Sequence, residues 1–204
     1  DTNSYNLATE TPKMVSLGLG RTTCSYFMPG DSTIIYASTH LKDAKCPHVP
    51  ERRVNGKYVW PIYDSYDIFI ADLEGNIVKQ VTTNNGYDAE ATVSPMGDKI
   101  VFTSLRSGDL ELYTCDIDGS NIQQVTDELG YDGGAFFSHD GKKLVFRASR
   151  PKSEEEIKEY KKSKLELEVW KIPTRMSRVA FFFVGNIRIN IEAQELLQPL
   201  RVAD

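Results

Sequence analysis

The chain repeats itself with a period of 44 residues. Residues 85–104 and 129–148 are identical at nine of twenty positions, without a gap. The similarity extends upstream, because the stretches that begin at Asp67 and Glu111 are also 44 residues apart. A period of about 40 to 50 residues is typical of β-propeller blades, each an antiparallel sheet of four strands. The repeat therefore predicts an all-β fold.

Within each repeat, the sequence predicts short strands separated by turns. Residues 99–104 (KIVFTS) and 143–148 (KLVFRA) are β-branched and aromatic runs that follow the turn sequences SPMGD and SHDGK. Residues 67–72 (DIFIAD) and 111–116 (ELYTCD) end at LEGN and IDGSN, where a glycine supplies the positive φ of a tight hairpin. A fourth strand follows at IVKQVT and IQQVT. Such a sheet must pack against neighbours to bury both faces.

A weaker copy precedes these two. Gly20 occupies the position of Gly86, 66 residues earlier, which is one period plus an insertion of 22 residues. We place the insertion within residues 39–63, which are rich in Pro, Lys and Arg. Residues 6–16 align with residues 72–82 and predict the second half of a further blade. The copies amount to about three blade equivalents.

The sequence after the last repeat predicts a helical excursion near residues 153–166. Ser153 is a suitable N-cap, and Glu154 and Lys158 form an i,i+4 pair. Apolar positions are few there, so we expect a solvated helix between two strands. Residues 167–172 (LEVWKI) predict the next strand.

Beyond this strand the repeat pattern stops. We divide the chain into propeller blades over residues 1–172 and a diverged segment over residues 173–204. The apolar run VAFFFVG at residues 179–185 predicts a buried strand. The diverged segment is a diverged blade, a cap on the open edge, or an unrelated sequence.

The repeats resemble the WD-repeat-like blades of the TolB family of bacterial propellers. Residues 93–126 match the family pattern F-S-P-D-G-x-x-I-x-F-x-S…G…D-I-Y-x-x-D-x-D-G-S-N-x-x-Q-L-T almost throughout. Residues 136–150 match its first half and residues 66–82 its second half. The resemblance covers about residues 6–150 and implies a propeller or a partial propeller, because such rings close with about four to eight blades.

Bulk composition excludes several classes of protein. A net charge of -5 and a pI near 5.3 argue against a general nucleic-acid binder, which needs a basic face. No apolar run reaches the roughly 18 residues of a membrane-spanning helix. Three cysteines allow at most one disulfide, so the chain is not a disulfide scaffold. The first ten residues have no signal-peptide pattern, and we expect no signal peptide in this chain.

The repeated GYD sequence supplies the first candidate site. It precedes the strand that lines the channel of a propeller, so it predicts a ring of acidic and aromatic side chains at one channel mouth: Tyr87, Asp88, Glu90, Tyr131 and Asp132. Such a mouth would accept a cation or a basic peptide. Alternatively, the aspartates bond turn amides and the tyrosines pack between blades. The ring is incomplete in either case, because the earlier copy has Arg21 and Thr22 at these positions.

The insertion at residues 39–63 supplies the second candidate site. It either packs over the ring as a structural loop or contacts a partner through Tyr58 and Trp60. Cys46 and His48 lie in it, but their spacing matches no compact zinc motif, and we expect no metal site. The sequences DLEGN and DIDGSN have a faint likeness to calcium loops but occupy hairpin positions, which favours turns.

No catalytic motif of the hydrolase, metalloprotease, P-loop or dinucleotide-binding kind occurs in the chain. We expect a non-enzymatic, protein- or peptide-binding propeller module without a cofactor. By resemblance it would work in the periplasm or outside the cell. Homo-oligomers through open blade edges are a further expectation, whereas nucleic-acid binding and membrane insertion are not.

Two alternatives stay open from the sequence. The chain is a propeller domain or fragment of a larger peptidase or glycan-acting enzyme, in which it gates or positions substrate. Otherwise, the acids around the channel carry out catalysis themselves.

Overall fold

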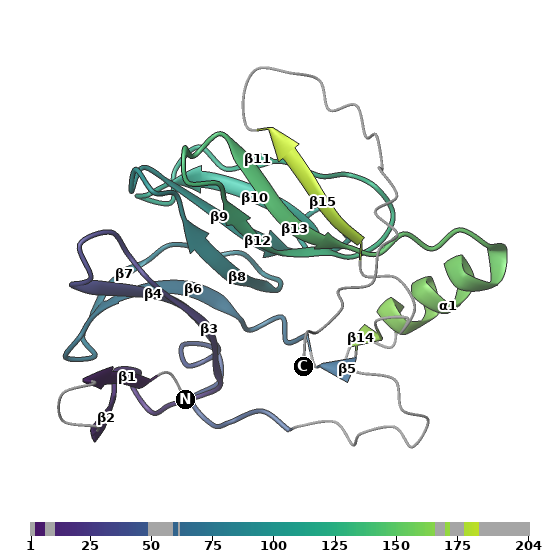
Figure 1. Ribbon diagram of the computed structural model, residues 1–204. Helices are drawn as coiled ribbons and strands as arrows, with labels where there is room; N and C mark the ends of the chain where they lie inside the picture. Colours follow the sequence, from purple (N-terminus) through teal and green to yellow (C-terminus); the bar gives the residue numbers. More distant parts are fainter. Residues whose placement is uncertain are drawn as a thin grey trace, which may run out of the picture.

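The computed structural model of the chain describes residues 3–6, 11–48, 59–60, 62–165, 170–171 and 178–183. Antiparallel sheets follow one another in space, from the hairpin near the N-terminus to the yellow strand β15 (Figure 1). The helix α1 (Glu154–Leu165) lies to one side of the sheets (Figure 1). None of the helices described is long and apolar enough to cross a membrane. The predicted all-β architecture with one helical excursion is confirmed.

Two of the sheets have four strands each, in the order that the repeats predict. The first contains β3 (Thr22–Phe27), β4 (Thr33–Ser38), β6 (Asp67–Asp72) and β7 (Ile77–Gln80). The second contains β8 (Asp88–Val93), β9 (Lys99–Ser104), β10 (Glu111–Asp116) and β11 (Gln123–Gln124). The predicted strands at residues 67–72, 99–104 and 111–116 are confirmed residue for residue.

The third sheet has three strands: β12 (Asp132–Phe137), β13 (Lys143–Ala148) and β15 (Arg178–Phe183). Near the N-terminus, β1 (Asn3–Asn6) and β2 (Thr11–Met14) form a separate two-stranded sheet. This hairpin is what the alignment of residues 6–16 with an outer blade half predicts. The described chain therefore holds three blade-like sheets and one isolated outer hairpin.

The strand that follows the helix does not join the third sheet. We expected residues 167–172 to supply the next strand after β13, but β14 (Trp170–Lys171) pairs with β5 (Val59–Trp60) inside the insertion. The neighbour of β13 is β15, which confirms a strand in the apolar run. β15 aligns six residues with β13, from Arg178 to Phe183.

Apolar side chains fill the spaces between consecutive sheets. Ile100 and Phe102 face the first sheet and pack with Ile35 and Ile68. The alternate residue Val101 faces the third sheet and packs in another cluster with Leu144 and Phe146. The middle sheet is thus covered on both faces, as the strand period of two requires. Each fully buried side chain of this size contributes roughly 1.5–3 kcal/mol.

Candidate functional site

The inner strands β3, β8 and β12 share one irregularity. Cys24, Glu90 and Gly134 hold the same position in the three repeats and have positive φ angles of 53°, 58° and 61°. Each lies within a shift in register between the inner strand and its neighbour. A bulge of this kind redirects the side chain of the bulged residue. In this way the repeat controls where Glu90 points.

Both aspartates of the GYD repeats are fully buried and paired with arginine. Arg106 donates to Asp88 at 2.9 Å. Arg150 donates to both carboxylate oxygens of Asp132, at 2.6 Å and 2.8 Å. Burial raises the pKa of both carboxyls, and the hydrogen bonds and charge of the arginines oppose this. The two acids are therefore shielded from solvent and their charge is compensated.

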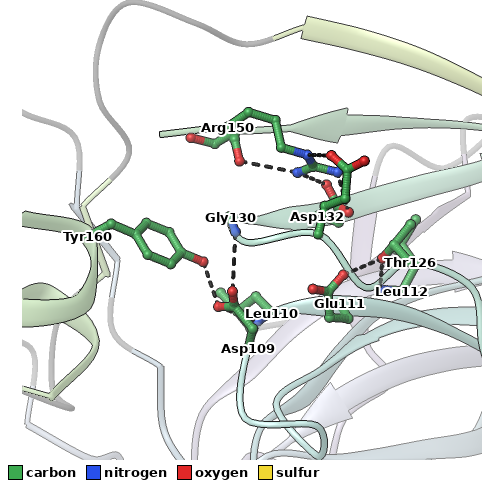
Figure 2. A network of polar contacts seen from close by, with 11 residues as sticks. Asp109, Leu110, Glu111, Leu112, Thr126, Gly130, Asp132, Arg150 and Tyr160 are labelled. Carbon is green, nitrogen blue, oxygen red and sulfur yellow. Dashed lines mark hydrogen bonds and ion pairs between the residues drawn. The ribbon is translucent and has the colours of Figure 1, made fainter. Parts of the chain in front are cut away.

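The polar contacts of Asp132 continue into the preceding sheet through Thr126 and Glu111, and we call this set of contacts between two sheets a blade junction. The Thr126 hydroxyl accepts from the Leu112 amide at 2.9 Å and donates to Glu111 at 2.6 Å (Figure 2). Burial raises the pKa of Glu111 to about 8, and the nearby Asp132 carboxylate also raises it. Thr82 accepts in the same way from the Ile68 amide one repeat earlier, at 3.0 Å. Each junction thus joins two sheets through a short polar network.

The first repeat lacks both members of the ion pair. Thr22 stands at the position of Asp88, and His40 at the position of Arg106. His40 is buried instead against the ring of Phe69, with 4.4 Å between the ring centroids. The aspartate and the arginine are both absent from this repeat, which indicates that the role of each is to pair with the other.

The tyrosines of the GYD repeats are also buried. Tyr87 and Tyr131 belong to one cluster with Tyr66 and with Tyr160 of α1. The ring of Tyr87 meets that of Tyr66 edge to face at 5.7 Å. Tyr160 donates to Asp109 at 2.6 Å, as Figure 2 shows, and so attaches α1 to the sheets. This is the packing that the second interpretation of GYD describes; ligand contact by these residues stays a prediction.

Glu90 is the half-buried member of the predicted mouth. Its Oε2 accepts from the Thr103 hydroxyl at 2.8 Å, the Gly134 amide at 2.9 Å and the Tyr131 hydroxyl at 3.0 Å. A Cβ at position 133 would overlap the carboxylate and the Tyr131 hydroxyl, so Gly133 has to be glycine. The carboxylate is therefore held rigidly by three uncharged donors.

Two accessible groups lie beside Glu90. The Cys24 thiol is free and exposed, and desolvation and the Glu90 carboxylate raise its pKa. Arg147 is exposed on β13, with its guanidinium 5.7 Å from the centre of the Tyr131 ring. Their charges interact, because Arg147 lowers the pKa of Cys24 against the larger effects. The accessible charges are thus different from those expected, since Asp88 and Asp132 are not among them.

The insertion is only partly described. Tyr58 lies outside the described residues, and for Trp60 the structure describes the β5 backbone alone. Partner contact by these two residues stays a prediction. Cys46 is a free, exposed thiol, and the backbone carbonyl of His48 accepts from the Tyr63 hydroxyl. Within the described part of the chain, no three His, Cys, Asp or Glu side chains gather as a metal site.

The calcium-like sequences are hairpin turns. In DLEGN, the Asp72 side chain accepts from the backbone amides of Glu74 and Asn76, both at 2.9 Å. Gly75 and Gly119 have φ angles of 90° and 81°. The turn interpretation is confirmed.

The two arginines that pair the buried aspartates escaped the sequence analysis. Their signal was present, since Arg106 and Arg150 follow their aspartates by 18 residues in both repeats. The bulge of the inner strands was harder to predict from the sequence. Of the three residues with positive φ there, only Gly134 is a glycine.

Comparison with known proteins agrees with this geometry. A family model described as the TolB beta propeller domain matches residues 61–172. The chain belongs to this family. No curated protein sequence matches it.

One of the similar solved structures, a TolB, shares the fold. TolB from Acinetobacter baumannii matches with a TM-score of 0.56 and 20% identity, over 88% of this chain and 34% of that one. The chain thus spans about a third of that TolB structure. A TolB described as putative, from Agrobacterium tumefaciens, matches with a TM-score of 0.43 and 20% identity, over 71% of this chain and 61% of that one. Dipeptidyl peptidase 4 from Porphyromonas gingivalis matches with a TM-score of 0.38 and 15% identity, over 72% and 26%.

Proposed function

We propose that this chain is a non-enzymatic module that binds a protein or peptide through its inner strands. The observation that carries the proposal is an accessible aromatic pair. Tyr26 of β3 and Phe136 of β12 are 38% and 49% exposed, and their rings meet edge to face at 6.3 Å. Exposed aromatic rings held by rigid strands are typical anchors of protein interfaces.

Charged groups lie on strands that pair with or pack against those of the aromatic pair, Glu90 on β8 and Arg147 on β13. We call this set the inner-strand surface: Cys24, Tyr26, Glu90, Phe136 and Arg147. Of the predicted mouth residues, Glu90 belongs to this surface. Tyr87, Asp88, Tyr131 and Asp132 lie behind it and support the strands. The proposed partner therefore meets apolar rings flanked by polar groups, the usual composition of a binding surface.

The proposed place of action is the bacterial envelope, in the periplasm or outside the cell. Membership of the TolB propeller family supports this location. Nothing in the described part of the chain favours the alternative of a domain that gates substrate in a larger enzyme.

An array of immobilised random octapeptides tests the proposal. We expect the wild-type chain to bind a subset of the peptides. The double variant Tyr26→Thr/Phe136→Thr places at both positions the residue found at Thr92 of β8, and it should lose at least ten-fold in signal. The control is Val78→Thr, because Val78 is 62% exposed on the outer strand β7. Equal signals from all three proteins, or no wild-type signal above background, would contradict the proposal.

A further inference from the structure

Arg147 is an accessible cation that the fold does not use. Arg106 and Arg150 each pair with a buried aspartate. Arg147 takes part in none of the ion pairs formed among the described residues. The other repeats have Ala37 and Thr103 at its position, so the blade architecture does not need an arginine there.

The guanidinium of Arg147 is held in place without being neutralised. It lies over the ring of Tyr131 and donates to the Tyr131 hydroxyl at 3.4 Å. An added Cβ on Gly134 would lie 3.7 Å from Nη2, an ordinary contact distance, so the guanidinium lies directly beside the bulge. A guanidinium fixed on a ring keeps its fork of donors oriented, which lowers the entropy lost on binding.

Glu90 does not occupy this fork. Its carboxylate accepts instead from Thr103, Tyr131 and Gly134, as described above. Tyr131 connects the two groups, because its hydroxyl donates to Glu90 and accepts from Arg147. The carboxylate is thus satisfied locally, while the other N–H groups of Arg147 stay available.

A second arginine, Arg21, directly precedes the strand that holds Cys24. Arg21 stands where the later repeats have tyrosine, and its charge lowers the pKa of Tyr66 against the effect of burial. The Cys24 thiol interacts electrostatically with both Tyr66 and Arg147. Arg21 also takes part in none of the ion pairs of the described residues. The thiol therefore lies near both an anion and a cation, because the Glu90 carboxylate raises its pKa and the Arg147 guanidinium lowers it.

We propose that Arg147 binds a carboxylate of the partner, so that the inner-strand surface selects acidic peptide segments. This inference rests on the proposed function and names its ligand class. A carboxylate matches the two-pronged donor geometry of a guanidinium. A basic segment would bring like charge to the same place, which raises the free energy of the complex. The carboxylate is either an Asp or Glu side chain or a peptide C-terminus.

The potential at the site is measurable without a partner, through Cys24. In a Cys46→Ser background, the remaining cysteine Cys115 is buried, so Cys24 is the accessible thiol. Two reagents are compared, the anionic sulfonatoethyl methanethiosulfonate and the cationic trimethylammonioethyl methanethiosulfonate. The rate at which each modifies Cys24 is divided by the rate at which the same reagent modifies mercaptoethanol. The measured ratio is the normalised rate of the anionic reagent over that of the cationic one. Because the Glu90 carboxylate also acts on the thiol, the test is the change on substitution, and we expect the ratio to fall at least three-fold in Arg147→Gln. A ratio unchanged by this substitution would overturn the inference.

The peptide array identifies the ligand class directly. Octapeptides with a fixed central Glu, Gln or Lys are each made with free and amidated C-termini. We expect the wild-type chain to bind the Glu set. The binding signal should be at least ten-fold weaker for Arg147→Gln and largely kept for Arg147→Lys. It should be unchanged for Lys142→Gln, the control at an exposed lysine. Dependence on the free terminus instead of the central Glu would identify the C-terminal carboxylate as the ligand.

The remaining outcomes separate the two proposals. Preference for the Lys set, or equal binding of Glu and Gln sets with either terminus, would overturn the carboxylate site and leave peptide binding intact. No binding of any set would overturn both. Matching circular dichroism spectra and thermal midpoints of the variants show that the fold is unchanged.

Discussion

Two single residues at the blade junctions, Asp88 and Asp132, are acidic side chains buried from solvent. Asp88 and Asp132 are fully buried, and each depends on one arginine from its own sheet. Removing one partner of a buried pair leaves an uncompensated charge, which costs about 3–5 kcal/mol. The GYD aspartates are therefore best understood as structural residues whose side chains stabilise the inner strands.

Replacing Arg150 by methionine tests this view. Arg150→Met leaves Asp132 without its cation and should lower the free energy of unfolding by about 3 kcal/mol or more. Urea denaturation followed by intrinsic fluorescence measures the change. The double variant Asp132→Asn/Arg150→Met removes the stranded charge and should recover part of the loss. A variant as stable as the exposed-lysine control Lys142→Met would contradict the structural role.

The buried Glu111 should make stability depend on pH. Its pKa is raised from 4.5 to about 8 in the fold, so the folded chain binds this proton more tightly than the unfolded chain. The stabilisation is complete below pH 4.5 and is lost as the pH rises through 8. Glu111→Gln stays neutral and should be more stable than the wild type at pH 9, by about 1 kcal/mol or more. Unfolding midpoints of the wild type and of Glu111→Gln at pH 6 and pH 9 measure this difference in stability. The same change in midpoint between the two pH values for both proteins would refute the prediction.

At the scale of elements, the sequence predicts strands best where both faces are buried. Strands β6, β9 and β10 match their predicted bounds because alternating apolar residues hold them between neighbouring sheets. The outer strand β11 shrinks to Gln123–Gln124, and both of these side chains are exposed. β15, and not β14, took the expected place beside β13, because the pairing of these strands is decided by partners distant in sequence.

The site was less predictable than the strands. The GYD residues were found, but their burial depends on two arginines in other turns and on Tyr160 in the helix. Arg147 gave no repeat signal, because it differs from Ala37 and Thr103 at the same position. Features that repeat are predictable by comparison of the copies, whereas the residue that breaks the repeat can be judged only with its surroundings known.

The close contact at the inner bulge should make Gly133 irreplaceable. A methyl group at this position would overlap the Glu90 carboxylate and the Tyr131 hydroxyl. We expect Gly133→Ala to lower the free energy of unfolding by about 1–3 kcal/mol, through forced displacement of both groups. Chemical denaturation measures the loss, with Gly86→Ala as control because its nearest neighbour is one side-chain amide. Equal stability of the two variants would show that the bulge adapts.

At the scale of the whole molecule, none of the sheets described here covers the far face of β3 as β3 and β12 cover β8. β8 is buried along nearly its whole length because β3 and β12 flank it. β3 has the same place in its own repeat, yet its last four residues are exposed. Phe27 of β3 is 47% exposed, whereas its counterpart Val93 is buried between two sheets. An exposed aromatic side chain, at a position that packs against a neighbouring sheet in the other repeat, favours association of two chains.

Self-association of the chain should therefore depend on Phe27. Light scattering at two concentrations is expected to show a mass above that of the single 23.0 kDa chain, with the larger species favoured at the higher concentration. Phe27→Lys places a charge on the uncovered face of β3 and should shift the mass to that of one chain. Val78→Lys, on the outer strand, should leave the association unchanged. Two copies of three sheets would fall within the range of about four to eight blades in which propellers close. A wild-type chain of single mass at both concentrations would mean that β3 stays exposed, and that the inner-strand surface is open from this side as well.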